Sequence, residues 1–157
     1  LFSLYRLWAQ NELKDLKKSN FRVIFSGDID EFPKDLPKIF KNLMERSKNN
    51  QGLTVNICLN YGGRQEILRA VQLAIKDNIK PEELTEEKFY QYFYTKDMPP
   101  ADILIRTSGE QRLSNFLLWQ LSYAELFFIK KHWPDFTKEN LDKIIDQYLS
   151  RDRRFGK

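Results

Sequence analysis

The sequence predicts an α/β fold in which a mostly parallel sheet carries helices on both faces. Short apolar strands alternate with longer stretches of helical periodicity, and small residues follow the strands. No linker, repeat or low-complexity segment divides the 157 residues. We therefore expect residues 1–157 to form a single α/β domain.

The first half of the chain alternates helix, strand, helix and strand. Residues 1–16 place apolar side chains at helical spacing, and residues 21–25 predict a strand that ends in a Ser-Gly-Asp turn. Prolines at 33 and 37 frame the start of a second helix, which residues 49–52 close. Residues 53–61 predict the next strand.

A glycine pair then turns the chain into a third helix. Gly62 and Gly63 permit a sharp turn, which could be a phosphate cradle but is more often a simple strand-to-helix connection. We favour the structural interpretation. The apolar side of this helix is expected to comprise Ile67, Leu68, Val71, Ala74 and Ile75.

The second half repeats the alternation. Thr85 is expected to cap a short helix within residues 80–95, and residues 102–106 predict a third, buried parallel strand. A helix over about 115–123 and a fourth strand over 125–129 follow. Thr137 is expected to cap the last helix, with Leu141, Ile144, Ile145, Tyr148 and Leu149 on its apolar face.

Composition excludes several function classes. Hydrophobic residues make up 41% and charged residues 31%, and no apolar run approaches the roughly 20 residues that a membrane-spanning helix needs. The net charge of +4 is spread among acidic residues, except for a dense cluster at 151–154, so nucleic-acid binding is disfavoured. The single cysteine, Cys58, cannot form an internal disulfide and is expected to be a buried core residue.

The chain starts with Leu1, already inside a helical pattern and without a capping residue. This predicts that an N-terminal portion is missing from the sequence. If it is absent, we expect an exposed apolar groove along residues 1–8.

Two arginines follow the third strand. Arg106 ends the strand, a turn of small residues follows, and Arg112 and Ser114 precede the next apolar run. The carboxyl end of a parallel strand is where open α/β sheets bind ligands, and guanidinium forks together with free turn N–H groups suit a phosphate or diphosphate. The alternative is that these arginines lie on the surface and pair with Glu110 and Asp102.

The run IRTSGEQRLSNFLLWQLSYAELFF, with the earlier NYGGR and the final RRFG, resembles the cis-prenyltransferase family, typified by undecaprenyl diphosphate synthase. The resemblance implies that family's fold. It also implies an activity, the condensation of isopentenyl diphosphate with an allylic diphosphate such as farnesyl diphosphate to give a long-chain cis-polyprenyl diphosphate. The loops SGDID, NYGGR and RTSGEQRLS would then gather along one edge of the sheet.

The resemblance also assigns site residues and partners. It implies that Arg106, Arg112, Ser114 and the backbone N–H of Leu113 bind isopentenyl diphosphate, and that Glu125 binds Mg²⁺. Arg154 and Gly156 of the tail would reach the diphosphate of the partner subunit in a homodimer, whose shared surface is expected at residues 116–128. A cytoplasmic location, with contact to a membrane surface through the lipid product, is implied as well.

The sequence departs from the family pattern in two places. The family's N-terminal Asp-Gly-Asn-x-Arg segment does not occur, so no residue is assigned as catalytic, and we expect the 157 residues alone to be inactive. Asp28 and Asp30 match a non-catalytic region, and Gln111 stands where some relatives have histidine. His132 is expected to be structural.

Two other function classes stay open. A non-catalytic partner subunit of a two-component cis-prenyltransferase would have lost the diphosphate site, which the retained Arg106, Arg112 and Ser114 argue against. An unrelated phosphate-binding α/β domain is the second class, and no Walker or dinucleotide glycine pattern supports it.

Overall fold

The computed structural model describes residues 2–7 and 20–151. Residues 2–7 are helical, and the rest of the expected first helix lies outside the described residues. Three 3-10 turns, η1 (Ile29–Glu31), η2 (Pro81–Glu83) and η3 (Trp133–Asp135), join the longer elements. The strands and α-helices are β1 (Arg22–Ser26), α2 (Asp35–Ser47), β2 (Thr54–Cys58), α3 (Gly63–Lys76), α4 (Glu86–Tyr90), β3 (Ile103–Arg106), β4 (Glu125–Phe128) and α5 (Lys138–Leu149).

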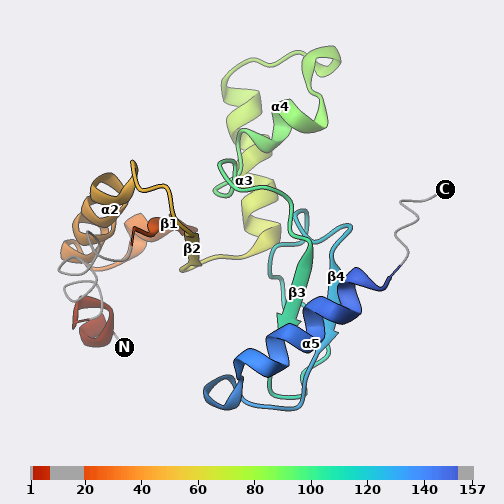
Figure 1. The fold of residues 1–157 in the computed structure, drawn as a ribbon. Coiled ribbons are helices and arrows are strands. Elements are labelled where there is room, and N and C mark those ends of the chain that lie inside the picture. Colours follow the sequence, from red (N-terminus) through yellow and green to blue (C-terminus); the bar gives the residue numbers. More distant parts are fainter. Residues whose placement is uncertain (1, 8–19, 152–157) are drawn as a thin grey trace.

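The α/β class with parallel strands is confirmed, but the four described strands form two separate pairs. β1 pairs with β2 in parallel, and β3 pairs with β4 in parallel. Figure 1 shows β1 and β2 with α2 on one side of the molecule, α3 and α4 above, and β3, β4 and α5 on the other side. The described strands therefore do not form one continuous sheet with a single edge at their carboxyl ends.

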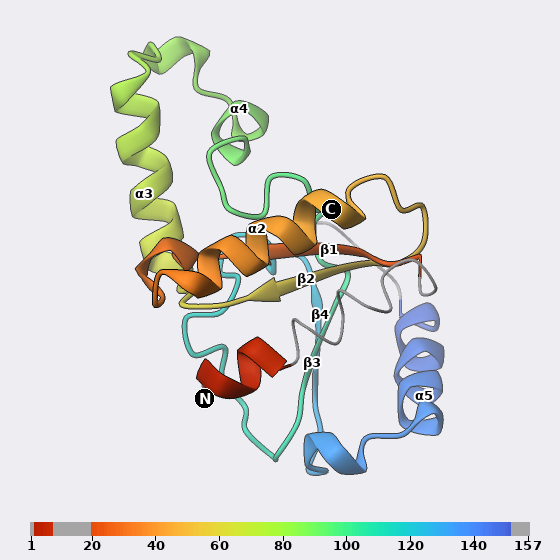
Figure 2. The same cartoon turned by 90° about the vertical axis from the view of Figure 1, so that its left-hand side faces the viewer.

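The core lies between α2 and the β1–β2 pair. Leu36, Phe40 and Leu43 of α2 are fully buried and form one cluster with Val23 and Phe25 of β1. The spacing of 36, 40 and 43 places these side chains on one helical face. Figure 2 shows α2 lying along β1 and β2. The expected second helix is confirmed.

The expected apolar face of α3 is wrong in part, since only Ala74 of its members is buried. Leu68, Val71 and Ile75 are 59%, 40% and 69% exposed, whereas the buried face contains Glu66 and small residues. A Cβ at Gly63 would lie 2.8 Å from Leu118 Cγ, so the glycine permits close approach on that side. Backbone approach and polar bonds, rather than hydrophobicity, decide which side of α3 faces inward.

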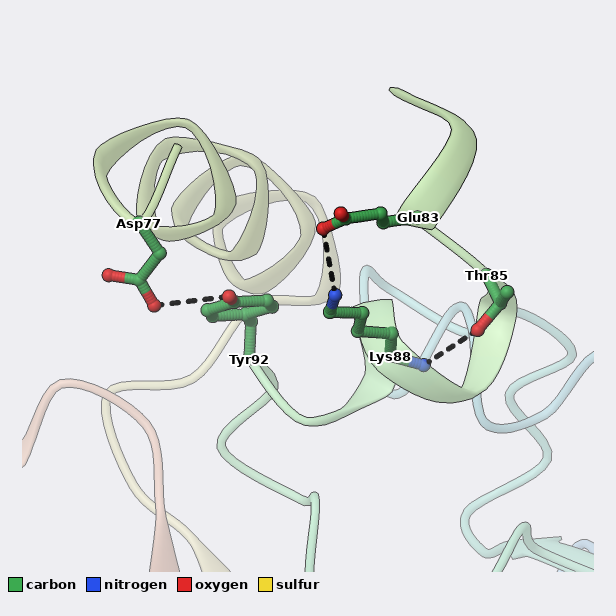
Figure 3. Close-up of polar contacts among 5 residues, drawn as sticks. All are labelled: Asp77, Glu83, Thr85, Lys88 and Tyr92. Carbon is green, nitrogen blue, oxygen red and sulfur yellow. Dashed lines mark hydrogen bonds and ion pairs between the residues drawn. The ribbon is translucent and has the colours of Figure 1, made fainter. Parts of the chain in front are cut away.

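Polar contacts attach α4 to the end of α3 (Figure 3). Thr85 caps α4 as expected, because its hydroxyl accepts from the Lys88 N–H at 3.2 Å. Lys88 Nζ pairs with Glu83 at 3.3 Å, and the Tyr92 hydroxyl donates to Asp77 at 3.0 Å. α4 itself is shorter than the predicted segment.

The helix expected over 115–123 does not form, and turns take its place. Positive φ angles at Ser114 (48°), Asn115 (65°) and Leu117 (45°) are incompatible with a right-handed helix. The fourth strand is confirmed as β4. None of the described helices is long and apolar enough to span a bilayer.

The last helix, α5, is capped as predicted. The Thr137 and Asn140 side chains form a reciprocal capping box at its start. Ile144 is buried, but Leu149 at the end of the helix is 73% exposed, so only part of the expected apolar face is covered. The Tyr148 hydroxyl donates to Asp102 Oδ1 at 3.0 Å and ties α5 to the start of β3.

Exposed apolar side chains occur at the described start of the chain, where a groove was expected. Phe2, Leu4 and Leu7 are 44%, 65% and 58% exposed. Leu1 and Trp8, the outer residues of the expected groove, lie outside the described residues.

Candidate functional site

Arg106 and Arg112 line one pocket at the carboxyl end of β3. The pocket has a volume of about 220 Å³, and we call it the arginine pocket. Leu113 lines it as well, beside the apolar Leu104 and Phe116. The structure thus brings together three of the residues expected to bind diphosphate.

Hydrogen bonds join the two ends of the turn between these arginines. Arg106 Nη1 donates to Ser114 Oγ at 3.2 Å and to the carbonyl oxygen of Arg112. The Arg106 side chain therefore contacts the backbone of Arg112 and the side chain of Ser114, although Arg112 is six positions further along the sequence. The bond to the Ser114 hydroxyl leaves other guanidinium N–H groups of Arg106 for a ligand.

The alternative pairing weighed for these arginines is present in part. Arg112 forms an ion pair with Glu110, and its side chain is 61% exposed. Asp102 instead accepts from the Tyr148 hydroxyl. An exposed ion pair of this kind is worth at most about 1 kcal/mol, so a multiply charged ligand can displace Glu110.

Two of the backbone N–H groups expected to be free are occupied. The Ser108 N–H donates to the Lys131 carbonyl at 2.7 Å, and the Gly109 N–H donates to the Ile129 carbonyl at 2.8 Å. Positive φ angles of 68° and 74° at Ser108 and Gly109 permit this turn. In the described part of the chain, the Leu113 N–H donates to no protein acceptor and stays open for a ligand.

Asn115 caps the N-terminus of α3, a role that sequence reasoning missed. Its backbone carbonyl accepts from the Gly63 N–H at 2.7 Å, and its Oδ1 accepts from the Arg64 N–H at 2.9 Å. Gly62, the local cap position, has no side chain to do this. The structural interpretation of Gly62 and Gly63 is confirmed, because Asn115 occupies the N–H groups that a phosphate would need.

The loops that follow β1 and β2 meet around a second, polar pocket of about 430 Å³. Asp28 and Asn60 line it, one from each loop, and the Asn60 amide donates to the Asp28 carbonyl at 3.1 Å. Asn115 lines it too. SGDID and NYGGR therefore gather as expected, and the loop after β3 reaches them through Asn115.

A buried carboxylate, Glu66, was not among the predicted site residues. It is 1% exposed and accepts from the Tyr61 hydroxyl, from Gln120 Nε2 at 2.8 Å and from Thr95. Burial, and then the hydrogen bond to Glu66, raise the pKa of Tyr61 above its ordinary value. Burial also raises the pKa of Cys58 to about 11, and the charge of Glu66 adds to this effect.

Glu125, the residue expected to bind Mg²⁺, lies at the opposite end of β4 from the arginine pocket. It pairs in register with Ile103 at the amino end of the β3–β4 pair, whereas Arg106 is at the carboxyl end. Three residues along a parallel strand span about 10 Å. The Glu125 carboxylate forms an ion pair with Arg151, and no cluster of three or more His, Cys, Asp or Glu residues occurs among the described residues.

The tail residues Arg154 and Gly156, expected to reach a partner subunit, lie outside the described residues. His132 is exposed, and its Nδ1 lies 3.2 Å from Ser108 Oγ. Together with the backbone bonds of Ser108 and Gly109, this contact holds the turn that follows Arg106 against the segment that follows β4. That is the structural role expected for His132.

The chain is similar to known proteins over nearly its whole length. A family model described as "Putative undecaprenyl diphosphate synthase" matches residues 1–156. An "Isoprenyl transferase" of Clostridium perfringens is 44% identical over 160 residues, which cover 99% of this chain and 63% of that protein. A "Ditrans,polycis-undecaprenyl-diphosphate synthase ((2E,6E)-farnesyl-diphosphate specific)" of Micrococcus luteus is 46% identical over 148 residues, 92% of this chain and 59% of that protein.

A solved structure is similar over nearly the whole chain. The crystal structure of a "probable undecaprenyl diphosphate synthase" from Campylobacter jejuni superposes with a TM-score of 0.87 at 33% identity, covering 99% of this chain and 73% of that one. The chain spans less than two thirds of the length of the two curated relatives. The chain belongs to the undecaprenyl diphosphate synthase family of prenyltransferases.

Proposed function

We propose that this chain binds isopentenyl diphosphate for cis-prenyl chain elongation of the undecaprenyl diphosphate type. The observation that carries the proposal is the arginine pocket, which Arg106 and Arg112 both line beside the open N–H of Leu113. The printed names of the relatives, an isoprenyl transferase in one case and a farnesyl-diphosphate-specific undecaprenyl-diphosphate synthase in another, support the same substrate class.

The chemistry of the pocket fits a diphosphate with a short apolar tail. Two guanidinium groups keep their charge at any relevant pH and match pairs of phosphate oxygens. The Leu113 N–H and the Ser114 hydroxyl add neutral donors, and Leu104 and Phe116 supply an apolar wall for a five-carbon group. In the proposed reaction the C–O bond of an allylic diphosphate breaks, the isopentenyl double bond attacks the freed carbon, and a proton is then lost.

What this chain contributes to that reaction is orientation. Fixing the diphosphate of the nucleophile fixes where its double bond lies, and such positioning supplies a large share of catalysis in two-substrate reactions. Glu110 holds the Arg112 fork in the absence of ligand. Binding therefore exchanges one exposed carboxylate for phosphate oxygens at the same guanidinium.

Magnesium is the metal that the family resemblance implies. Mg²⁺ binds carboxylate and phosphate oxygens and would neutralise diphosphate charge when bound. Glu125 is the residue that would hold Mg²⁺ in this proposal, in exchange for its partly exposed ion pair with Arg151. Diphosphate contacts by Arg154 and Gly156 belong to the same proposal.

The proposal includes a homodimer that shares the surface around residues 116–128, at a cytoplasmic membrane face where the lipid product is used. Phe116 and Leu126 are each 39% exposed on this surface, which supports a contact between copies. Sedimentation velocity at two protein concentrations tests it, and a monomer at both would refute it.

Calorimetry with isopentenyl diphosphate and with ATP tests the proposed site. Isopentenyl diphosphate should bind and ATP should not, because a nucleoside does not fit the apolar wall. Arg112→Ala should weaken binding about thirty-fold or more, since a charge-assisted bidentate contact is worth at least about 2 kcal/mol. Arg112→Lys should recover only part of the loss, because an ammonium lacks the fork.

Arg46→Ala is the matched control, because Arg46 is an exposed arginine in the last turn of α2, away from the arginine pocket. It removes the same charge and should change affinity less than about two-fold, as expected for screened distant charges. Equal losses in Arg46→Ala and Arg112→Ala, or equal binding of ATP and isopentenyl diphosphate, would contradict the proposal.

A further inference from the structure

The outer side of α3 carries an apolar surface that the other described residues leave largely uncovered. Leu68, Val71 and Ile75 are 59%, 40% and 69% exposed, and their spacing places them within about 60° of one another around the helix axis. We call these three residues the α3 stripe. Ala70 and Ala74, on the inward side, are already buried. A helix with apolar side chains on two sides is typical of an element that is covered on both.

No charged side chain interrupts the α3 stripe, and charges of opposite sign lie beyond its two ends. Arg64, one turn before Leu68, is exposed and forms no ion pair among the described residues. Glu82 of η2, which follows the carboxyl end of α3, is likewise exposed and unpaired in the described chain. Lys76 lies about 100° from Ile75 around the axis and is therefore off the stripe. Two such surfaces complement each other when they meet in opposite directions.

The α3 stripe adjoins residues 116–128, the surface that the proposed homodimer shares. A Cβ at Gly63 would lie 2.8 Å from Leu118 Cγ, so the start of α3 packs directly on this surface. Trp119 contacts Phe89 of α4 edge-on, with ring centroids 5.4 Å apart. α4 is in turn attached to the end of α3 by the contacts drawn in Figure 3. Residues 116–128 therefore reach the start of α3 directly and its end through α4.

We propose that the contact between copies extends onto α3, with the α3 stripe of one copy packed against the α3 stripe of a second copy. The inference rests on the homodimer of the proposed function and adds the helix that joins the two chains. Burial of the apolar side chains supplies the driving force, and exposed apolar patches mark contacts of this kind. A second copy is favoured as the occupant because the stripe continues the surface that the same copy already covers.

Two-fold symmetry sets the orientation of the two helices. In a symmetric dimer the same patch serves both chains, so an axis that passes near Val71, at the centre of the stripe, makes the α3 helices antiparallel. Leu68 of one copy then lies near Ile75 of the other. Arg64 of each copy approaches the carboxyl end of the other α3, where free carbonyl groups and Glu82 carry negative charge.

Sedimentation velocity over a range of protein concentrations measures the dissociation constant of the dimer. Leu68→Ser with Ile75→Ser should raise this constant at least about 100-fold, because four large apolar side chains per dimer lose their burial. Leu4→Ser with Leu53→Ser is the matched control, since these leucines are 65% and 64% exposed and lie outside α3 and residues 116–128. The control should change the constant less than about two-fold. Circular dichroism checks that both double variants fold.

A cysteine at the symmetry axis tests the orientation. Val71→Cys places two thiols across the axis, within the roughly 7 Å between Cα atoms that a disulfide allows. Mild oxidation should therefore convert most of this variant to a covalent dimer on a non-reducing gel. Ile145→Cys on α5 is the control, because Ile145 is 37% exposed and so resembles Val71, and it should form no more covalent dimer than the parent chain. Cys58 contributes little, because burial raises its pKa to about 11 and keeps it protonated.

The outcomes separate this inference from the homodimer itself. A dimeric parent chain whose dissociation constant is unchanged by Leu68→Ser with Ile75→Ser would refute the role of α3 and leave the homodimer standing. A parent chain that is monomeric at every concentration would refute both. A lipid surface is the competing occupant, and binding of the monomer to phosphatidylglycerol vesicles that the same double variant abolishes would overturn the proposal. Weakened dimerisation together with selective cross-linking of Val71→Cys supports it.

Discussion

The Asn115 cap predicts a stability effect that links the arginine pocket to α3. Asn115→Ala removes the Oδ1 that accepts from the Arg64 N–H at 2.9 Å and the amide that donates to Gln65 at 2.9 Å. It keeps the backbone bond from the Gly63 N–H. The substitution also places alanine at a φ of 65°, where asparagine is tolerated better.

The magnitude follows from these two parts. Loss of an N-cap side chain costs about 1 kcal/mol, and alanine in the left-handed region costs about 1 kcal/mol more. Asn78→Ala is the matched control, because Asn78 has a φ of 53° but makes no side-chain hydrogen bond in the described structure. Asn115→Ala should therefore lower the free energy of unfolding by about 2 kcal/mol and Asn78→Ala by about 1 kcal/mol.

Urea unfolding followed by circular dichroism measures both values. In a chain of this size the Asn115→Ala effect corresponds to a fall in Tm of about 4–8 °C. Asn115→Asp keeps the acceptor and places a negative charge at the helix N-terminus, so it should stay within about 0.5 kcal/mol of the parent chain. Equal destabilisation by Asn115→Ala and Asn78→Ala would refute the capping role.

Two further predictions concern the loops and the single cysteine. Gly27→Ala should lower the free energy of unfolding by about 3 kcal/mol or more, because the new Cβ would lie 2.0 Å from the Leu59 carbonyl oxygen at a φ of 120°. Gly109→Ala should lower it by only about 1 kcal/mol, because its Cβ would meet no atom within 4 Å. Thermal unfolding compares the two variants, and equal losses would contradict this reasoning. Burial favours the neutral thiol and raises the pKa of Cys58 from 9.0 to about 11. The thiolate fraction of Cys58 at pH 8 should therefore be about 100-fold below that of a thiol with the ordinary pKa. Its rate of alkylation by iodoacetamide should keep rising until the pH passes about 11. A rate that levels off near pH 9 would show that the thiol is not shielded.

The elements that could be predicted from sequence are those specified by local pattern. β1, β2 and β3 coincide with short apolar runs that end in small or polar turn residues, and α2 coincides with a regular apolar stripe. The closeness of Arg106, Arg112 and Ser114 could also be anticipated, because the strand end and the short turn confine all three to a small volume.

The features that could not be predicted depend on contacts distant in sequence. The inward face of α3 is decided by Glu66, whose partners Thr95 and Gln120 are 29 and 54 residues away. Hydrophobic periodicity instead indicated Leu68 and Ile75, which are exposed. A buried carboxylate is stable only with several donors, and local patterns contain no information about where those donors come from.

The absence of the predicted helix after Asn115 has a physical cause that also explains the site. Ser114 accepts from Arg106, Asn115 caps α3, and the Phe116 ring contacts Tyr61 with centroids 6.0 Å apart. Consecutive residues on an α-helix point about 100° apart, so a helix cannot direct three in a row at β3, α3 and the loop after β2. The left-handed φ angles at Ser114 and Asn115 make this possible, and their cost of about 1 kcal/mol each is offset by the bonds formed. The turn segment therefore couples the arginine pocket to the N-terminus of α3, because both chain neighbours of Asn115 belong to the proposed diphosphate site: Ser114 bonds to Arg106, and Phe116 lines the pocket.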